Sequence, residues 1–365
     1  MITSSPRLFR YVSGRFLAHF MVFMLLLVGI ILVLDVIELL RRTSDNGDVA
    51  FNMIVSVALM KLPYMAESTI PVGILFSAIY TCWKLNKTSE LVVMRSAGLS
   101  AWQFLTPLLV CAGLIGIFST AVINPIAAVF YSRYEQLEKL HIEGDANLAT
   151  ISKTGIWLRQ PTEEGYALIN ASKLDSEQWQ MKNVIAMFFD KEDNFLKRMD
   201  AEQVGLVEGY WNFEQPTVNT NFGENFKEPL IQLSTELTSK KIEESFSSPE
   251  TIPFWGIADY IRVMRETGLS TTAMKIHFHK LISQPLLFLG LILLAAVFSL
   301  RPLRSSNTAY MIMAAVMIGF GVFFMETFLE AFGLSHKIPA YLAAWSPSII
   351  SLLAGISLIL HLEDG

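Results

Sequence analysis

What this chain has little of narrows its class before any motif is considered. Only 17% of its 365 residues are charged, and it contains only two cysteines, Cys82 and Cys111, each inside an apolar stretch. Two such cysteines imply no disulfide framework, and we expect both to be buried packing residues. The formal net charge of −5 argues against nucleic acid as a partner.

The chain also lacks the motifs of common catalytic and metal sites. It contains no Gly-x-x-x-x-Gly-Lys-Ser/Thr run, so we expect no phosphate-cradling loop and no ATP hydrolysis by this chain in that way. His277 and His279 lie two residues apart, which would point their rings to different faces of a helix. We therefore expect no metal site, no directly bound cofactor and no enzyme activity.

Apolar residues, in contrast, are abundant and arranged in two blocks. They make up 52% of the chain, and the mean hydropathy is +0.44. A helix of about 20 apolar residues crosses the hydrocarbon core of a bilayer. The first run exceeds the apolar core of a cleavable signal, so we interpret it as a transmembrane helix. The predicted spans are residues 16–39, 51–83, 101–122, 280–300, 309–332 and 340–360.

These spans divide the chain into three parts. We predict an N-terminal membrane part at 1–130, a polar insert at 131–270 and a C-terminal membrane part at 271–365. Pro63 and Pro71 interrupt the long second span, which we expect to be strongly tilted or broken.

Basic residues orient the spans. Cytoplasmic loops carry an excess of lysine and arginine, so the three basic segments predict cytoplasmic termini and an insert on the outer side. The residues concerned are Arg7, Arg10, Arg15, Lys84, Lys87, Arg95, Arg301 and Arg304. Arg41 and Arg42 would then lie at the outer surface, where they are either exceptions to the rule or contacts for an anionic ligand.

The polar insert reads as a strand-rich domain. Short runs of strand-forming residues, separated by turn signals, predict an antiparallel sandwich or roll. The expected strands are 155–159, 166–171, 183–189, 195–199, 203–208, 210–213 and 230–233, with helices expected at 131–143 and 254–265. We expect a binding or docking module.

Residues 86–98, between the second and third spans, predict a short amphipathic helix. Thr88 or Ser89 would cap its start, Gly98 would end it, and Glu90 lies near the positive end of its dipole. Its expected apolar face comprises Leu91, Val92 and Met94. Such a helix either lies on lipid or fits a socket on a cytoplasmic partner, with Glu90 paired to a basic residue there.

Several charged residues fall within or at the ends of spans, where they are costly and usually face a cavity or a partner. Spacing places Asp35, Glu38 and Arg42 on one helix face and Glu326 with Glu330 on another. One interpretation is a set of hydrated or mutually paired groups at the interface. In the other, spans one and five line a lateral entry for lipid, whose sugar phosphates meet Arg41 and Arg42.

Four short patches resemble one family. Residues 89–94, Ser-Glu-Leu-Val-Val-Met, are followed by Ala97-Gly98. Gln284-Pro285-Leu286 opens span four, Pro302-Leu303-Arg304-Ser305 follows it, and Trp345-Ser346-Pro347-Ser348 enters span six. Together with the three-plus-three layout, these resemble the lipopolysaccharide export permeases, the LptF/LptG family, over essentially the whole chain. The Gln-Pro-Leu and Pro-Leu-Arg-Ser patches favour the LptG branch.

The resemblance implies a fold, a location and partners. It implies an α-helical membrane protein of the Gram-negative inner membrane with six transmembrane helices and an inserted external β-jellyroll domain. Members pair as an LptF–LptG heterodimer on two copies of the ATPase LptB, which would bind ATP and Mg²⁺. The complex lifts lipopolysaccharide from the membrane and passes it to a periplasmic jellyroll bridge that begins with LptC.

The resemblance also implies site residues. Those for coupling to the ATPase would be Ser89, Glu90, Leu91, Val92, Met94 and Arg95, and the basic residues Arg41 and Arg42 would bind lipid. To these the spacing of charges within the spans adds Asp35, Glu38, Glu326 and Glu330 as expected lipid-binding or gating residues. Leu40-Arg41-Arg42 matches a Leu-Lys-Lys pattern of the family. Asp35 departs from it, since some relatives carry a lysine deeper in this span.

Two other classes stay open from the residues alone. A secondary transporter would use the intramembrane carboxylates as proton or ion relays, and its transport would ignore nucleotide. A membrane-anchored assembly factor would act through its external domain without the six spans.

Overall fold

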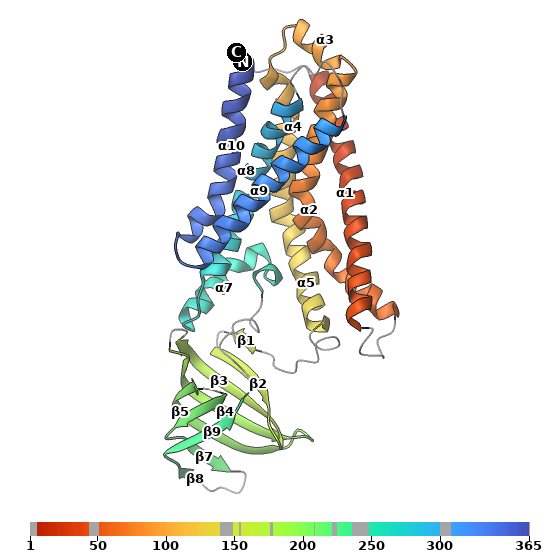
Figure 1. Cartoon of the computed structure of the whole chain (residues 1–365). Helices are drawn as coiled ribbons and strands as arrows, with labels where there is room; N and C mark the ends of the chain where they lie inside the picture. The colour runs from red at the N-terminus through yellow and green to blue at the C-terminus, as the bar shows by residue number, and fades with distance from the viewer. Residues whose placement is uncertain are drawn as a thin grey trace. The chain divides into compact units, whose positions relative to one another are not determined.

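Long helices form where the apolar runs predict them, and strands fill the polar insert (Figure 1). The computed structural model describes residues 6–43, 51–138, 149–152, 155–175, 178–207, 209–220, 225–235, 248–299 and 308–364. The chain separates into a helical unit and a β unit, each with its own hydrophobic core. The helical unit comprises Met1–Tyr131, Pro253–Trp255 and Lys275–Gly365, and the β unit comprises Ser132–Ile252 and Gly256–Met274.

Within the described residues, six helical stretches are long and apolar enough to cross a membrane, three before the strands and three after them. The first three are α1 (Pro6–Thr43), α2 (Phe51–Lys87) and a continuous stretch of α4 (Ala101–Phe118), a π-helical turn (Ser119–Ile123) and α5 (Asn124–Glu138). The last three are α8 (Thr272–Ser299), α9 (Thr308–Leu334) and α10 (Ala340–Asp364). The predicted three-plus-three fold is confirmed.

Of the two alternatives expected for the second span, a break is wrong, because α2 continues through Pro63 and Pro71, each of which removes only one backbone donor. The third helical stretch continues from the predicted span at 101–122 as far as Glu138. The π-helical turn just before Pro125 widens the helix there, and Thr120 in it donates a hydrogen bond to the Leu281 carbonyl oxygen at 2.9 Å.

The helical core is centred on α8. Of its most apolar window 61% is buried, against only 6% for α1 and for α9. Glycines allow the close approach of neighbouring backbones: a Cβ atom on Gly290 would lie 2.8 Å from the Leu352 nitrogen of α10. A Cβ atom on Gly116 of α4 would lie 2.6 Å from Cα of Pro285 in α8. Lipid tails are as apolar as the helices, so no hydrophobic force drives the helices together within a membrane. Close packing at small residues such as these glycines stabilises the helix contacts instead.

The β unit is one antiparallel sheet with the order β1-β2-β3-β4-β5-β6-β9, in which β7 pairs with β5 and β8. The strands are β1 (Ala149–Ser152), β2 (Gly155–Pro161), β3 (Gly165–Asp175), β4 (Gln180–Asp190), β5 (Phe195–Val207), β6 (Tyr210–Glu214), β7 (Thr217–Thr220), β8 (Asn225–Lys227) and β9 (Leu230–Ser234). The helix expected after Pro253 is α7 (Phe254–Glu266).

Three of the strands were not predicted from the sequence, and two of the predicted strands form a single strand. β1, β7 and β8 are short and lack a clear apolar alternation. β5 joins the expected strands 195–199 and 203–208, since its ladder with β4 continues across the residues between them. The helix expected at 131–143 ends within the described residues at Glu138, as the end of α5.

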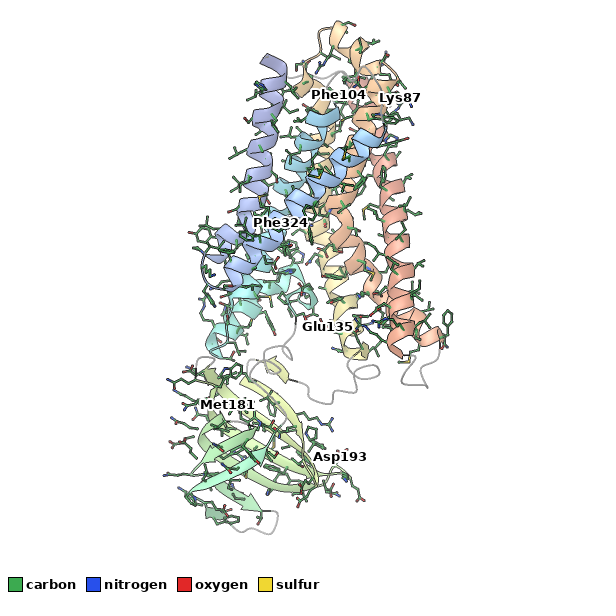
Figure 2. All side chains as sticks on the ribbon, viewed as in Figure 1. Lys87, Phe104, Glu135, Met181, Asp193 and Phe324 are labelled. Carbon is green, nitrogen blue, oxygen red and sulfur yellow. The ribbon has the colours of Figure 1, made fainter. Side chains whose placement is uncertain are left out.

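A buried amide joins strands that the backbone ladder leaves apart. The Gln160 side chain of β2 is only 3% exposed. Its Nε2 donates to the Ser234 carbonyl oxygen of β9 at 2.5 Å, and its Oε1 accepts from the Trp211 Nε1 of β6 at 2.7 Å. The two ends of the strand order are therefore brought together, as expected for a roll, around a core that includes Phe213 and Met181 (labelled in Figure 2).

We predict that Gly290→Ala lowers the thermal stability of the detergent-solubilised protein. The added methyl group must displace the backbone of α10, which costs about 1–3 kcal/mol for an overpacked core. Gly321→Ala is the matched control, because no atom lies within 4 Å of its Cβ position. Alanine there gains up to about 1 kcal/mol of helix propensity. Equal unfolding temperatures for the two variants would contradict the proposed α8–α10 contact.

Candidate functional site

A seven-residue helix, α3 (Glu90–Ser96), lies at the same end of the helical unit as the start of α1 and the end of α10 (Figure 1). Ser89 occupies its N-cap position in the left-handed conformation (φ 58°), and its side chain makes no capping hydrogen bond. Gly98 follows the helix with φ +83° and donates to the Arg95 carbonyl oxygen at 2.9 Å. The predicted helix and glycine stop are confirmed, but the capping role of Ser89 is not.

The apolar residues of α3 divide between two faces. Leu91 is buried in the helical core and Met94 packs against it. Val92 and Val93 are 59% and 65% exposed. Val92 therefore does not share a face with Leu91 and Met94, contrary to the sequence prediction. α3 is anchored by one apolar side and presents the other at the surface.

Glu90 is bonded within the chain. Its Oε2 accepts a hydrogen bond from the Tyr11 hydroxyl at 2.7 Å, and its Oε1 accepts from Arg15 at 3.2 Å and from the Thr88 hydroxyl at 3.0 Å. Arg15 also lies over the Tyr11 ring, 4.6 Å from its centroid. Desolvation by burial raises the pKa of the Glu90 carboxyl, but the three hydrogen bonds and the Arg15 charge outweigh it and leave the pKa below its ordinary value.

α1 and α2 carry two further polar contacts along their length. His19 Nδ1 and the Thr81 hydroxyl lie 2.8 Å apart, and Thr81 is fully buried. Closer to the other end, Lys61 of α2 donates to Asp35 of α1 at 2.7 Å, with side-chain exposures of 23% and 10%. The second carboxylate oxygen of Asp35 is buried and has no hydrogen-bond partner within the part of the chain that the structure describes. Asp35 is thus drawn toward α2, and it pairs with neither Glu38 nor Arg42.

Glu38, Arg41 and Arg42 form a separate cluster at the C-terminal end of α1. The Glu38 carboxylate accepts from Arg41 at 2.8 and 2.9 Å and from Arg42 at 2.9 Å. All three side chains are well exposed. Guanidinium groups such as these can bind phosphate or another anion through charge-assisted hydrogen bonds.

The carboxylates of α9 meet one lysine of α8. Lys280 Nζ lies 3.7 Å from Glu326 and 3.4 Å from Glu330. The predicted pair therefore shares a face, but its partner across the helices escaped prediction. The neighbouring His277 is half-buried, and His279 accepts from Trp345 Nε1 of α10 at 3.4 Å. Among the described residues, no group of three or more His, Cys, Asp or Glu side chains could hold a metal ion.

The outer surfaces of α1 and α9 are broad and apolar. On α9 the rings of Phe320, Phe324 (labelled in Figure 2), Phe328 and Phe332 stack in sequence, with centroids 6.2, 5.9 and 4.6 Å apart. The first three are at least 50% exposed. α1 exposes the large side chains Met21, Val22, Leu25, Leu26, Ile30, Val33, Leu34 and Ile37. Such extended apolar faces require lipid or a protein partner to cover them.

The family described as "Lipopolysaccharide export system permease LptF/LptG" matches residues 10–361. The chain belongs to the LptF/LptG family. It is similar to the lipopolysaccharide export system permease protein LptG of Haemophilus influenzae, with 22% identity over 94% of this chain and 95% of that protein. It is also similar to the protein of the same name from Escherichia coli K12, with 20% identity over 96% and 97%. The predicted family, and its LptG character, are confirmed.

An LptF/LptG member is a permease of lipopolysaccharide export, so this chain is a transporter component and a multi-pass inner-membrane protein. Some of the residues around its predicted sites could not be found from the sequence. Tyr11 and Arg15 have the i, i+4 spacing of one helix face, but nothing in the sequence indicates Glu90 as their partner. The patch 302–305 and the basic residues Arg301 and Arg304 lie outside the described residues.

We predict that Lys61→Met destabilises the protein more than the double change Asp35→Asn with Lys61→Met. The single change leaves the carboxylate of Asp35 largely buried without its lysine, at a cost of about 1–3 kcal/mol after allowance for partial exposure. Thermal unfolding in detergent of both variants and of Asp35→Asn completes a double-mutant cycle. Lys87→Met, at the exposed end of the same helix, is the control. Strictly additive effects would exclude an energetic coupling of Asp35 and Lys61.

Proposed function

We propose that this chain is the LptG-like permease subunit of an ABC-type lipopolysaccharide exporter. It extracts lipopolysaccharide from the inner membrane together with an LptF-like second subunit. A cytoplasmic LptB-like ATPase dimer supplies the energy and holds ATP and Mg²⁺. An LptC-like periplasmic bridge receives the lipid. The termini and α3 face the cytoplasm, and the β unit faces the periplasm.

The observation that carries this proposal is the apolar surface of α3. Leu91 and Met94 hold the helix against the core, so Val92 and Val93 stand exposed on a rigid base. The basic residues of α1, α2 and α3 lie around it, as the positive-inside rule requires of a cytoplasmic end. A short apolar knob beside charged residues suits a socket on a soluble ATPase, since its burial supplies binding energy.

The lipid path is proposed along α1 and α9. These spans leave their apolar faces largely exposed, so acyl chains and the second subunit would cover them. Arg41 and Arg42, held by Glu38, would contact the phosphates of the lipid at the outer rim. Asp35, Glu326 and Glu330 would line the interior of this path, each beside a lysine that reduces the cost of its charge.

The β unit is proposed to deliver lipid to the bridge. Its curled antiparallel sheet has the form of a jellyroll-like module, and successive modules of one kind could pass an amphiphilic ligand along a continuous surface. Its strand edges offer backbone donors and acceptors for a neighbouring sheet.

The proposed ATPase socket is tested by Val92→Asp with Val93→Asp. A charged group cannot replace the methyl groups that the socket would bury, so we expect recovery of the ATPase with the affinity-purified permease to fall by at least about tenfold. Ser96→Asp, which adds a charge to the same helix without removing apolar surface, should retain the ATPase.

Full recovery of the ATPase with the Val92 and Val93 double variant would contradict the proposal. That outcome would instead favour a helix that lies on lipid. Transport that follows an ion gradient and ignores nucleotide would favour the secondary transporter.

The proposed phosphate contact is tested by Arg41→Glu with Arg42→Glu. Three carboxylates at the end of α1 would repel the lipid phosphates, so photocrosslinking of lipopolysaccharide to probes in α1 should be abolished. Arg7→Glu with Arg10→Glu, at the opposite end of the same helix, is the control and should retain the crosslink. Unchanged crosslinking in the Arg41 and Arg42 variant would exclude their role.

A further inference from the structure

We infer that Tyr11 and Arg15 are positioning residues that fix α3 to α1, so that a force on α3 moves α1 and α2 as one body. This inference rests on the proposed function, and it adds which span receives the force. The chain connects α3 directly to α2 and, through a loop, to α4, but not to α1. A non-covalent brace gives α3 a direct link to α1, in addition to the indirect link through α2.

The brace consists of two side chains of α1 that meet the carboxylate of Glu90. Tyr11 and Arg15, one turn apart on α1, donate to different oxygens of Glu90, at 2.7 and 3.2 Å. Arg15 also covers the Tyr11 ring, which orders both side chains. The side chains of Arg15 and Glu90 are 33% and 27% exposed, so water screens the pair only in part.

The junction between α2 and α3 is short and itself hydrogen-bonded to Glu90. Only Thr88 and Ser89 separate the two helices, and Ser89 has the left-handed conformation that turns the chain. The Thr88 hydroxyl is 3.0 Å from both the Lys84 carbonyl oxygen and Glu90 Oε1. Glu90 is thus a common acceptor for groups of α1 and of the α2–α3 junction.

Below the brace, α1 and α2 are joined again at two depths. His19 meets Thr81 at 2.8 Å, and Asp35 meets Lys61 at 2.7 Å. Between these contacts a Cβ atom on Gly73 would lie 2.6 Å from the Met24 sulfur, so the helices approach closely. Contacts at both ends and in the middle make the pair α1–α2 resist relative sliding, and the brace extends this rigid body to α3.

The consequence concerns transmission rather than assembly. Val92 and Val93, which would contact the ATPase, are exposed and are not among the groups that bond to Glu90. Loss of the brace would leave that surface intact, and the ATPase would still bind and hydrolyse ATP. The movement of α3 would then no longer be carried fully to α1, whose apolar face is proposed to line the lipid path.

The experiment uses the complete complex in proteoliposomes that contain lipopolysaccharide. ATP hydrolysis and ATP-dependent lipid release are measured for Tyr11→Phe with Arg15→Gln. We expect the amount of lipid released per ATP hydrolysed to fall about fivefold, because loss of a partly exposed ion pair weakens the contact between α1 and α3 by about that factor. Hydrolysis per complex should stay within about twofold, because the brace makes no contact with the nucleotide site of a separate chain. Arg10→Gln, which removes an exposed charge from the same turn region of α1, should leave the ratio unchanged.

A rescue separates transmission from general destabilisation. In a variant with Tyr11→Cys and Glu90→Cys, the ratio should fall in the reduced protein and recover when a short bismaleimide joins α1 to α3. An unchanged ratio in the Tyr11 and Arg15 variant, a parallel loss of hydrolysis and release, or a crosslink without recovery would each overturn the inference. If the variant with Tyr11→Phe and Arg15→Gln fails to fold, the amount of lipid released per ATP hydrolysed by Tyr11→Phe alone tests the inference. A wild-type complex that releases no lipid with ATP would instead refute the proposed function.

Discussion

The hydrocarbon core of the membrane is the constraint on which the rest of this structure depends. It offers no water to backbone donors and acceptors, so each crossing segment must satisfy them within a helix. This explains why α2 continues through Pro63 and Pro71 and why a π-helical turn, and not a loop, precedes Pro125. The strands, whose bonds need a partner strand, are confined to the insert.

The same constraint makes every polar side chain in the spans informative. A charged group in an apolar medium requires a counter-charge, and α1, α2, α8 and α9 supply them to one another. Asp35 forms an ion pair with Lys61, and Glu326 and Glu330 both form ion pairs with Lys280. These pairs connect helices that apolar packing alone would leave free to slide. The described spans are therefore joined by a few polar contacts as well as by apolar packing.

Polar side chains also join parts of the β unit, but in a different arrangement. In the spans, ion pairs connect helices, whereas in the β unit the buried amide of Gln160 connects strands. Gln160 can do so because both its donor and its acceptor find partners on other strands, so its burial leaves neither group unsatisfied. The described residues of the insert pack around a hydrophobic core of their own.

The six spans, the inserted sheet and the short helix of residues 90–96 could be predicted from the amino-acid sequence, because apolar length, strand alternation and a glycine stop are local signals. Short patches also indicated the family. Local periodicity can indicate the face that a residue occupies, but not the neighbour that this face meets. The partners of Asp35, Glu330 and Glu90 lie 26, 50 and 75 residues away along the chain, so they became evident only from the folded chain. The exposure of Val92 was decided in the same way, because both sides of α3 are apolar and only the packed core selects the side that is buried.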